Sequence, residues 1–167
     1  MLGIDIVDLS DPQFKSRDKR SLKLILNKGD QLIEHEQIFW LLWCAKEAVF
    51  KCHREDIDFS PTSIPIQINN ELEFNSGNSS GRIEIRSEYI LAVCSDNLDN
   101  IQYEVVKDRK RVNSKNLREI ISKFILNNNL GESLGSDSLG LPIILPSEQE
   151  ISISHHGRFG AFAFPCE

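Results

Sequence analysis

The sequence predicts an α+β protein from three observations. A short alternating run opens the chain, where Ile4 and Ile6 flank Asp5. Residues 34–54 contain no Gly or Pro, and their apolar side chains recur at three- and four-residue steps, as in a helix. Short β-like runs fill the middle of the chain, and a second helical pattern and a closing hairpin follow them. Helices and antiparallel strands in separate runs are typical of the α+β class.

Length and composition favour one compact folded unit. The chain has 167 residues, of which 40% are hydrophobic and 26% are charged, an ordinary mixture for a globular protein with a core. It carries 25 acidic and 19 basic residues, which gives a formal net charge of -6. Such a chain has no broad positive field, so we expect no nucleic-acid partner.

Neither a membrane span nor a leader peptide is expected. No apolar run approaches the length that crosses a bilayer, and the first ten residues hold two acids and no basic segment. The cysteines form no CxxC pair and have apolar neighbours, which favours reduced, buried thiols over disulfides or zinc ligands. They are Cys44, Cys52, Cys94 and Cys166. We therefore expect a cytoplasmic protein without a membrane partner.

The elements of the first part are expected as a strand followed by two helices. Residues 4–7 form the strand, which places Asp5 on the face opposite the two isoleucines. A shorter helix over 20–34 is broken near Gly29, because glycine favours helix ends. The long helix over 34–54 is apolar on most of its circumference, so it should be largely buried.

The second part should hold an antiparallel sheet, a helix and a hairpin. The strands are the segments IPIQI, ELEF, GRIEIRSE, YILAVCS and IQYEVV. An amphipathic helix starts after residue 107, and its apolar side carries Leu117, Ile120, Ile121, Phe124 and Ile125. The Gly/Ser-rich segment 131–140 is predicted as a loop, and it lacks the Gly-Lys-Ser/Thr ending of a phosphate-binding loop. The segment EISISHHGRFGAFAF should form two strands around an HHGR turn.

Three charged residues of the first part could carry chemistry. Glu47 and Lys51 lie four apart on one helix face, and the simple interpretation is a salt bridge worth about 0.2–0.5 kcal/mol. Their apolar surroundings suggest instead that they are partly buried, and buried charges need partners or a metal. Asp5 lies either at an exposed strand edge or opposite a cation. Two carboxylates without neighbouring Cys or His would suit Mg²⁺, which commonly bridges to substrate phosphates.

The closing hairpin supplies a second group of candidates. Ser154, His155, His156 and Arg158 lie at its tip, where polar residues usually cap a turn. His155 follows the alternating strand, so it could instead project into a cleft. A basic run begins at residue 107 and continues into the amphipathic helix. It could form either a solvated helix face or a patch that binds phosphate. It comprises Lys107, Arg109, Lys110, Arg111, Lys115 and Arg118.

The segments GIDIVDL, WCAKEAVFK and SISHHGRFGAFAF together resemble the signature motifs of the 4′-phosphopantetheinyl transferase superfamily. The resemblance implies transfer of 4′-phosphopantetheine from coenzyme A to a serine of an acidic apo carrier protein. It also implies Mg²⁺ on the pyrophosphate and release of adenosine 3′,5′-bisphosphate. The holo-acyl-carrier-protein synthase type is the expected activity, and the carrier could serve fatty-acid, polyketide or peptide synthesis.

The motif positions imply a role for each candidate residue. Asp5 and Glu47 match the metal carboxylates, and Lys51 matches the lysine that contacts phosphate and assists deprotonation of the serine. Ser154 and His155 match the pair that contacts coenzyme A. Three further candidates are Arg158 and Lys46 for coenzyme A binding and Asp30 for orienting the base or a water.

The order of the motifs implies two pseudo-symmetric subdomains in swapped order. In the larger relatives a segment similar to the closing hairpin comes first, whereas here it ends the chain. Residues 1–107 are therefore expected to form the acidic half and residues 108–167 the smaller Ser-His half, in a monomer with its cleft inside one chain. The alternative is the architecture of the small acyl-carrier-protein synthases, which are shorter and assemble as trimers.

Two positions depart from the family pattern. Val7 stands where the large enzymes often have a third acid, and Asp8 is one residue too far along the strand to replace it. Leu141 stands where a lysine would contact phosphate, so binding would depend on Arg158 or the basic run. These departures keep a second hypothesis open, a coenzyme A- or carrier-binding module with impaired catalysis. A purely structural domain is the third.

Overall fold

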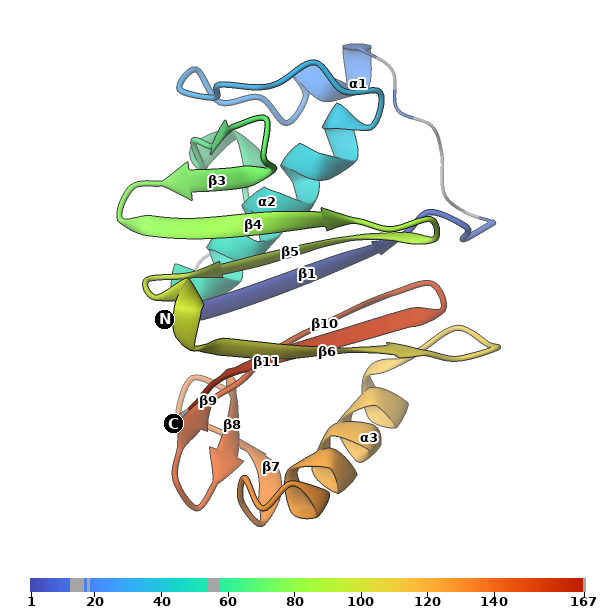
Figure 1. The fold of residues 1–167 in the computed structure, drawn as a ribbon, viewed down its shortest axis with the longest axis vertical. Coiled ribbons are helices and arrows are strands. Elements are labelled where there is room, and N and C mark those ends of the chain that lie inside the picture. Colours follow the sequence, from blue (N-terminus) through green and yellow to red (C-terminus); the bar gives the residue numbers. More distant parts are fainter. Residues whose placement is uncertain (13–16, 18, 54–57, 167) are drawn as a thin grey trace.

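The computed structural model describes residues 1–12, 17, 19–53 and 58–166. Its main layers follow the order helix α2, first sheet, second sheet, helix α3 (Figure 1). Each half thus combines one antiparallel sheet with one long helix. This arrangement confirms the predicted α+β class.

The first sheet and α2 form one half. Its strands follow the antiparallel order β1-β5-β4-β3-β2. They are β1 (Leu2–Asp8), β2 (Gln67–Ile68), β3 (Glu73–Ser76), β4 (Ser79–Ile85) and β5 (Tyr89–Ser95). The helical elements of this half are α1 (Lys19–Lys23), α2 (Ile38–His53) and two 3-10 turns at Pro61–Ser63 and Leu98–Asn100.

The second sheet and α3 form the other half. Its strands follow the antiparallel order β10-β11-β6. They are β6 (Ile101–Lys107), β10 (Ser152–His156) and β11 (Phe159–Pro165), beside α3 (Ser114–Asn127). A small third sheet lies beside them, formed by β7 (Ser133–Ser136), β8 (Pro142–Leu145) and β9 (Gln149–Glu150).

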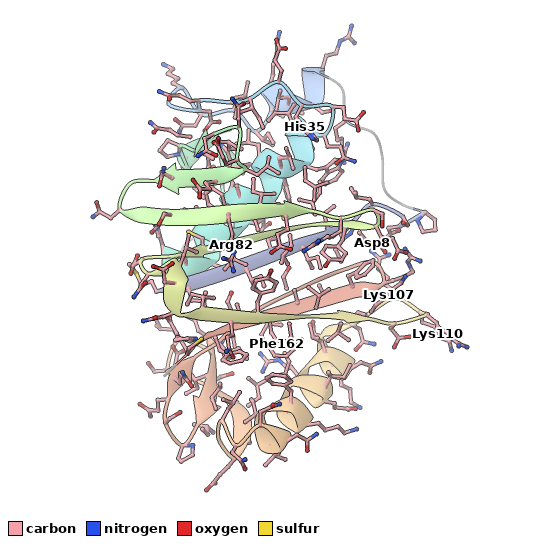
Figure 2. The ribbon with its side chains drawn as sticks, viewed as in Figure 1. Asp8, His35, Arg82, Lys107, Lys110 and Phe162 are labelled. Atoms are coloured by element: carbon pink, nitrogen blue, oxygen red, sulfur yellow. The ribbon has the colours of Figure 1, made fainter. Side chains whose placement is uncertain are left out.

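Three apolar clusters hold the layers together. Val7 and the buried side of α2 form the first cluster, between the helix and the first sheet. The second lies between the two sheets and includes Ile4, Ile6 and Ala161. The third lies between the second sheet and α3, where Phe162 is enclosed (Figure 2). Burial of these apolar surfaces is the main stabilising contribution to the fold.

Gly3 allows β1 and α2 to approach each other closely. A Cβ atom at this position would overlap the carbonyl oxygen of Ala48 in α2. Glycine is the one residue without a side chain to obstruct such a contact. The close packing brings Asp5, two residues further along β1, against the same helix.

Most predicted elements are confirmed, and one helix prediction is wrong. The opening strand and long helix are present, and Asp5 points away from the cluster that holds Ile4 and Ile6. The shorter helix predicted over 20–34 is limited to Lys19–Lys23. The following residues turn instead, because Asp30 accepts backbone hydrogen bonds from within and beyond this segment. Side-chain acceptors of this kind compete with helical hydrogen bonding.

The segment 131–140, predicted as a loop, contains β7, which pairs with β8. The sequence prediction omitted β8, whose four residues begin with a proline. Strand β6 pairs with β11, so the sheets divide between β5 and β6 rather than after residue 107. An alternating run such as IQYEVV indicates a strand but not the sheet that it joins.

The two ends of the chain both contact strand β9. The amino group of Met1 is 3.1 Å from Glu150 Oε1, and Gln149 Nε2 donates to the carbonyl of Pro165 at 2.8 Å. Figure 1 shows both ends on the same side of the molecule. A short connection between them should therefore cause little strain.

We expect a circular permutant with residues 108–167 before residues 1–107, joined by a short Gly/Ser linker, to fold. Its far-UV spectrum and thermal unfolding should be close to those of the original order. A permutant opened inside α3 is the matched control, and it should unfold at a lower temperature. Loss of the native far-UV spectrum in the first permutant would contradict the expectation.

Candidate functional site

A cleft of about 630 Å³ lies where the two halves meet. Helix α2 forms one wall and α3 the other, with β1 and β10 at its base. The polar side chains that line it are Asp5, Glu47, Lys51, Ser114, Arg118, Ser154, His155 and His156, beside Trp40 and Trp43. Seven of the sequence candidates therefore come together here, namely Asp5, Glu47, Lys51, Ser154, His155, His156 and Arg118.

Strands β1 and β10 are neighbouring edge strands that are joined through side chains. Ser152 Oγ accepts a hydrogen bond from the backbone N–H of Ile4 at 3.0 Å. His156 Nδ1 accepts one from the N–H of Asp8, also at 3.0 Å. These contacts fix the register in which the hairpin faces β1.

Asp5 is the centre of the polar contacts in the cleft. The residue is 6% exposed, and Oδ1 accepts hydrogen bonds from Lys51 Nζ at 2.8 Å and from Ser154 Oγ at 2.7 Å. Lys51 Nζ also donates to the carbonyl of Ile4 at 3.1 Å and lies 4.0 Å from Glu47 Oε2. Ser154 of the second half thus binds directly to the acidic group of the first half.

The charges of this group influence one another. Burial opposes the charged form of Lys51, but Asp5 and Glu47 outweigh this effect, so the pKa of Lys51 is raised and the amine stays protonated. The pKa of Glu47 is also raised, first by burial and then by the negative charge of Asp5, against the opposing effect of Lys51. The two carboxylates of the first half therefore repel each other, and a metal cation bound to both, in addition to Lys51, would relieve this repulsion.

The donor set fits a hard divalent cation that keeps several water ligands. Asp5 and Glu47 offer carboxylate oxygens, the ligand type that Mg²⁺ prefers, in a cleft that solvent can enter. Within the described residues, no group of three or more His, Cys, Asp or Glu side chains is placed to hold a metal. Val7, at the position of the third acid, lines the cleft with an apolar side chain. Water and substrate oxygens would have to complete the shell.

His155 faces the first turn of α3. Its Nε2 atom lies 2.9 Å from Ser114 Oγ, and the helix starts there because Asn113 caps it by accepting the N–H of Asn116. Desolvation, followed by the positive charges of Lys51 and Arg111, lowers the pKa of His155, so its ring is neutral at pH 7. Ser114 could not be recognised from the sequence, since a serine after a helix cap carries no signal of its own.

Asp30 and Lys46 were predicted site residues, but the structure does not place them among the residues that line the cleft. They form a salt bridge of 2.8 Å in which the side chains are 1% and 0% exposed. Lys46 also donates to the carbonyl of Pro61, and Asp30 accepts the N–H of Ile66. These contacts attach α2 to the loops beside it, so the pair stabilises the fold rather than lining the cleft.

We expect Lys46→Ala to destabilise the protein by roughly 3–5 kcal/mol, because it leaves the buried carboxylate of Asp30 without its countercharge. Chemical denaturation would measure the loss. Lys28→Ala, at an exposed position beside the same loop, is the control and should change stability little. Equal stabilities of the two variants would contradict a structural role of the pair.

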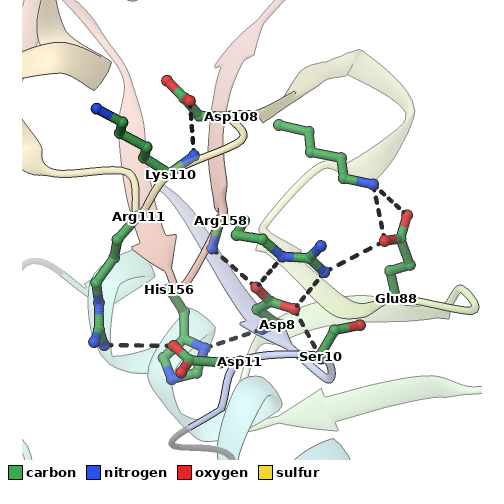
Figure 3. Close-up of polar contacts among 10 residues, drawn as sticks. Asp8, Ser10, Asp11, Glu88, Asp108, Lys110, Arg111, His156 and Arg158 are labelled. Atoms are coloured by element: carbon green, nitrogen blue, oxygen red, sulfur yellow. Dashed lines mark hydrogen bonds and ion pairs between the residues drawn. The ribbon is translucent and has the colours of Figure 1, made fainter.

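Arg158 was predicted to bind coenzyme A, but it too lies outside the cleft lining. It binds Asp8 through Nε at 3.2 Å and Glu88 through Nη2 at 3.3 Å (Figure 3). Glu88 also binds Lys107 at 2.7 Å, and Arg111 lies 3.5 Å from Asp11. Three basic side chains thus meet acids of the first half, of which Glu88 lies in the turn between β4 and β5.

Leu141 lines a smaller apolar pocket of about 130 Å³ next to the cleft, together with Lys51 and Pro142. Among the described residues that line this pocket, Lys51 is the one cation, and no second one takes the place of the missing lysine. Within the main cleft, Arg118 of α3 is the basic residue on the side opposite Lys51. Arg118 is therefore the member of the basic run that lines the cleft, whereas Arg158 of the hairpin does not line it.

Comparisons with known proteins agree with this site. The family model for the 4′-phosphopantetheinyl transferase superfamily matches residues 1–94, more than half of the chain, and includes Asp5, Glu47 and Lys51. No curated protein and no solved structure matches the chain. None of the helices in the described part is long and apolar enough to span a membrane. With the family model covering the whole acidic half of the cleft, the chain belongs to the 4′-phosphopantetheinyl transferase superfamily.

Proposed function

We propose that the protein transfers 4′-phosphopantetheine from coenzyme A to a serine of an apo carrier protein in a Mg²⁺-dependent reaction. The observation that carries this proposal is the contact of both halves at Asp5, where Lys51 of the family motif and Ser154 of the closing hairpin bind the same oxygen. In the reaction, the serine oxygen attacks the phosphorus that bears the pantetheine. The bond to the bridging oxygen breaks, and adenosine 3′,5′-bisphosphate leaves.

Asp5 and Glu47 would hold the metal ion. When bound, Mg²⁺ would neutralise the pyrophosphate and stabilise the leaving phosphate. The hydrogen bonds from Lys51 and Ser154 to Oδ1 of Asp5 orient its carboxylate, and neither of them uses Oδ2. Ser154 therefore contributes to the acidic half of the site as well as to the coenzyme A side.

Lys51 acts as a fixed positive charge near the phosphoryl oxygens. Because Asp5 and Glu47 keep it protonated, it donates hydrogen bonds to oxygens on which negative charge develops in the transition state. A protonated amine cannot accept the proton of the serine. Glu47 lies 4.0 Å from Lys51 in the same cleft, and its carboxylate would accept that proton.

The remaining cleft residues would bind coenzyme A. His155 is held by Ser114, and Arg118 offers a positive charge to a phosphate on the α3 side. The aromatic rings of Trp40 and Trp43 provide apolar surface on the α2 side. Because both walls belong to one chain, we infer that the monomer is active. Light scattering during turnover would test this, and an obligate trimer would contradict it.

We expect His155→Ala to raise the KM for coenzyme A about tenfold, because it removes one neutral hydrogen-bonding contact. The change in kcat should be smaller. Ser114→Ala should produce part of this effect, because it frees the ring. His156→Ala is the comparison, since its Nδ1 atom is occupied by the N–H of Asp8. That variant should reduce stability more than it raises KM. A larger KM effect at His156 would mean that the other imidazole contacts the substrate.

Incubation with coenzyme A, Mg²⁺ and an apo carrier protein, followed by mass spectrometry of the carrier, tests the activity. We expect the carrier to gain one phosphopantetheine and the reaction to stop when the metal is chelated. Binding of coenzyme A without any gain in carrier mass would identify an impaired binding module instead. Parallel assays with acyl and peptidyl carriers would show which pathway is served.

A further inference from the structure

The tip of the closing hairpin encloses the carboxylate of Asp8, the last residue of β1 (Figure 3). Asp8 is fully buried, and it accepts hydrogen bonds from the backbone N–H groups of Ser10 at 2.8 Å and of Arg158 at 2.9 Å. The Arg158 guanidinium adds contacts from Nε to Oδ2 at 3.2 Å and from Nη2 to Oδ1 at 3.4 Å. Charged and backbone donors on both oxygens hold the carboxylate in one orientation.

Alternation along β1 explains why this acid meets the hairpin rather than the cleft. Asp8 follows Asp5 by three residues, so the two side chains leave the strand on opposite faces. Asp5 lines the cleft, whereas Asp8 shares the face of Ile4 and Ile6, which packs against the second sheet. The acid that cannot replace the third metal ligand therefore lies where the two halves meet.

Glycine at the tip makes this contact possible. Gly157 has a φ of +57°, in the left-handed region, and a Cβ atom there would overlap Oδ2 of Asp8. Its carbonyl accepts the N–H of Val112 at 2.8 Å, and the carbonyl of Arg158 accepts the N–H of Asp108 at 2.9 Å. The tip thus binds the end of β1 on one side and the segment that leads into α3 on the other.

The cleft contacts lie directly beside this tip. Ser154, which donates to Asp5 at 2.7 Å, precedes Arg158 by four residues on the same hairpin. His155 lies 2.9 Å from Ser114, which follows the Val112 contact by two residues. A shift of the tip would therefore change the positions of Ser154 and His155 together.

We propose that Asp8 and Arg158 are positioning residues, which hold Ser154 and His155 at the separation from Asp5 that coenzyme A requires. Arg158 acts through the hairpin and does not line the cleft. Removal of either partner leaves the other charge without its counterion at a buried contact, and such a loss disrupts the local structure. The inference rests on the proposed function for the identity of the ligand, but the placement of the His155 ring can be tested without it.

An NMR titration of His155 tests this placement in the absence of substrate. Burial and then the charge of Lys51 lower the pKa of His155. We expect both Asp8→Asn and Arg158→Gln to raise that pKa toward the ordinary value of an exposed imidazole, because the ring moves away from its buried position. Asp8→Asn is the sharper variant, since loss of a negative charge would by itself lower the pKa of a neighbouring imidazole.

Arg86→Gln is the matched control for this titration. It breaks an ion pair of 2.8 Å with Glu84, which lies within the first sheet and does not involve the hairpin. This variant should leave the pKa of His155 unchanged, and thermal unfolding should show that all three variants are folded. If Asp8→Asn does not fold, Arg158→Gln and its control decide the result. An unchanged pKa in Arg158→Gln, or an equal shift in Arg86→Gln, would overturn the inference.

A double-mutant cycle then separates positioning from direct binding of coenzyme A. The two tryptophans of the chain, Trp40 and Trp43, both line the cleft, so the change in their fluorescence measures the Kd without any transfer. Arg158→Gln should weaken binding about fivefold in the original protein but much less beside His155→Ala, because residues of one network are not additive. Additive losses would mean that Arg158 contacts coenzyme A itself, which would overturn the inference. If coenzyme A does not bind the original protein, the proposed function fails, whereas the titration still decides the placement of His155.

Discussion

Asp5→Asn and Glu47→Gln are each expected to reduce the transfer rate by roughly 10²–10³-fold, comparable to loss of one strong electrostatic stabiliser of a transition state. Both side chains line the cleft, and each substitution keeps the shape while removing the charge that attracts a cation. The rate should be measured by the gain in carrier mass over a range of Mg²⁺ concentrations. The affinity for Mn²⁺, followed by electron paramagnetic resonance, gives a second readout that does not depend on turnover.

Asp99→Asn and Glu71→Gln are the matched controls, since both acids are exposed and outside the cleft lining. They should leave the rate and the metal affinity unchanged. Thermal unfolding of all four variants would show that the folds are intact. A cleft variant with near-normal turnover at limiting Mg²⁺ would remove that carboxylate from the metal site.

Lys51→Met is expected to lower kcat by roughly 10²-fold or more, while the KM for coenzyme A changes less. The physical reason is that Lys51 is held protonated beside Asp5 and Glu47, where its charge is most useful in the transition state. Single-turnover measurements would separate chemistry from binding. Lys51→Arg keeps the charge, but its planar fork cannot reproduce the contacts to both Asp5 and Ile4, so it should recover only part of the rate.

Lys28→Met removes an exposed lysine from the same half and serves as the control for Lys51→Met. It should leave kcat and KM unchanged. A rise in KM with an unchanged kcat for Lys51→Met would make Lys51 a binding residue only. Stability must be measured as well, because this substitution removes the positive charge that lies 2.8 Å from the buried Asp5 carboxylate.

The acidic half of the site could be predicted from local patterns. Alternation in β1 placed Asp5 on the face opposite Ile4 and Ile6, and helical spacing placed Glu47 one turn before Lys51. The structure confirms both placements, because each depends only on the geometry of one element. The contact between β1 and α2 also had a local signal in Gly3, although its function became clear only from the packing.

Contacts between distant segments were decided by the tertiary structure. Lys46 lies next to Glu47 in the sequence, but it points into a buried pair with Asp30, because adjacent helix residues face different sides. Arg158 lies near His155 in the same hairpin, yet it binds Asp8. In both cases sequence proximity to a functional motif suggested a role in the cleft that the side-chain direction does not support.

By itself, the sequence determined the α+β class, the family motifs and the acidic group Asp5, Glu47 and Lys51, since each lies within one element and follows its periodicity. Only the tertiary structure decided which strand of the other half lies beside β1, that β6 joins β11, and that Ser114 and Arg118 of α3 close the cleft. Strand pairing and helix packing depend on contacts between segments far apart in the chain. Local periodicity carries no information about such partners.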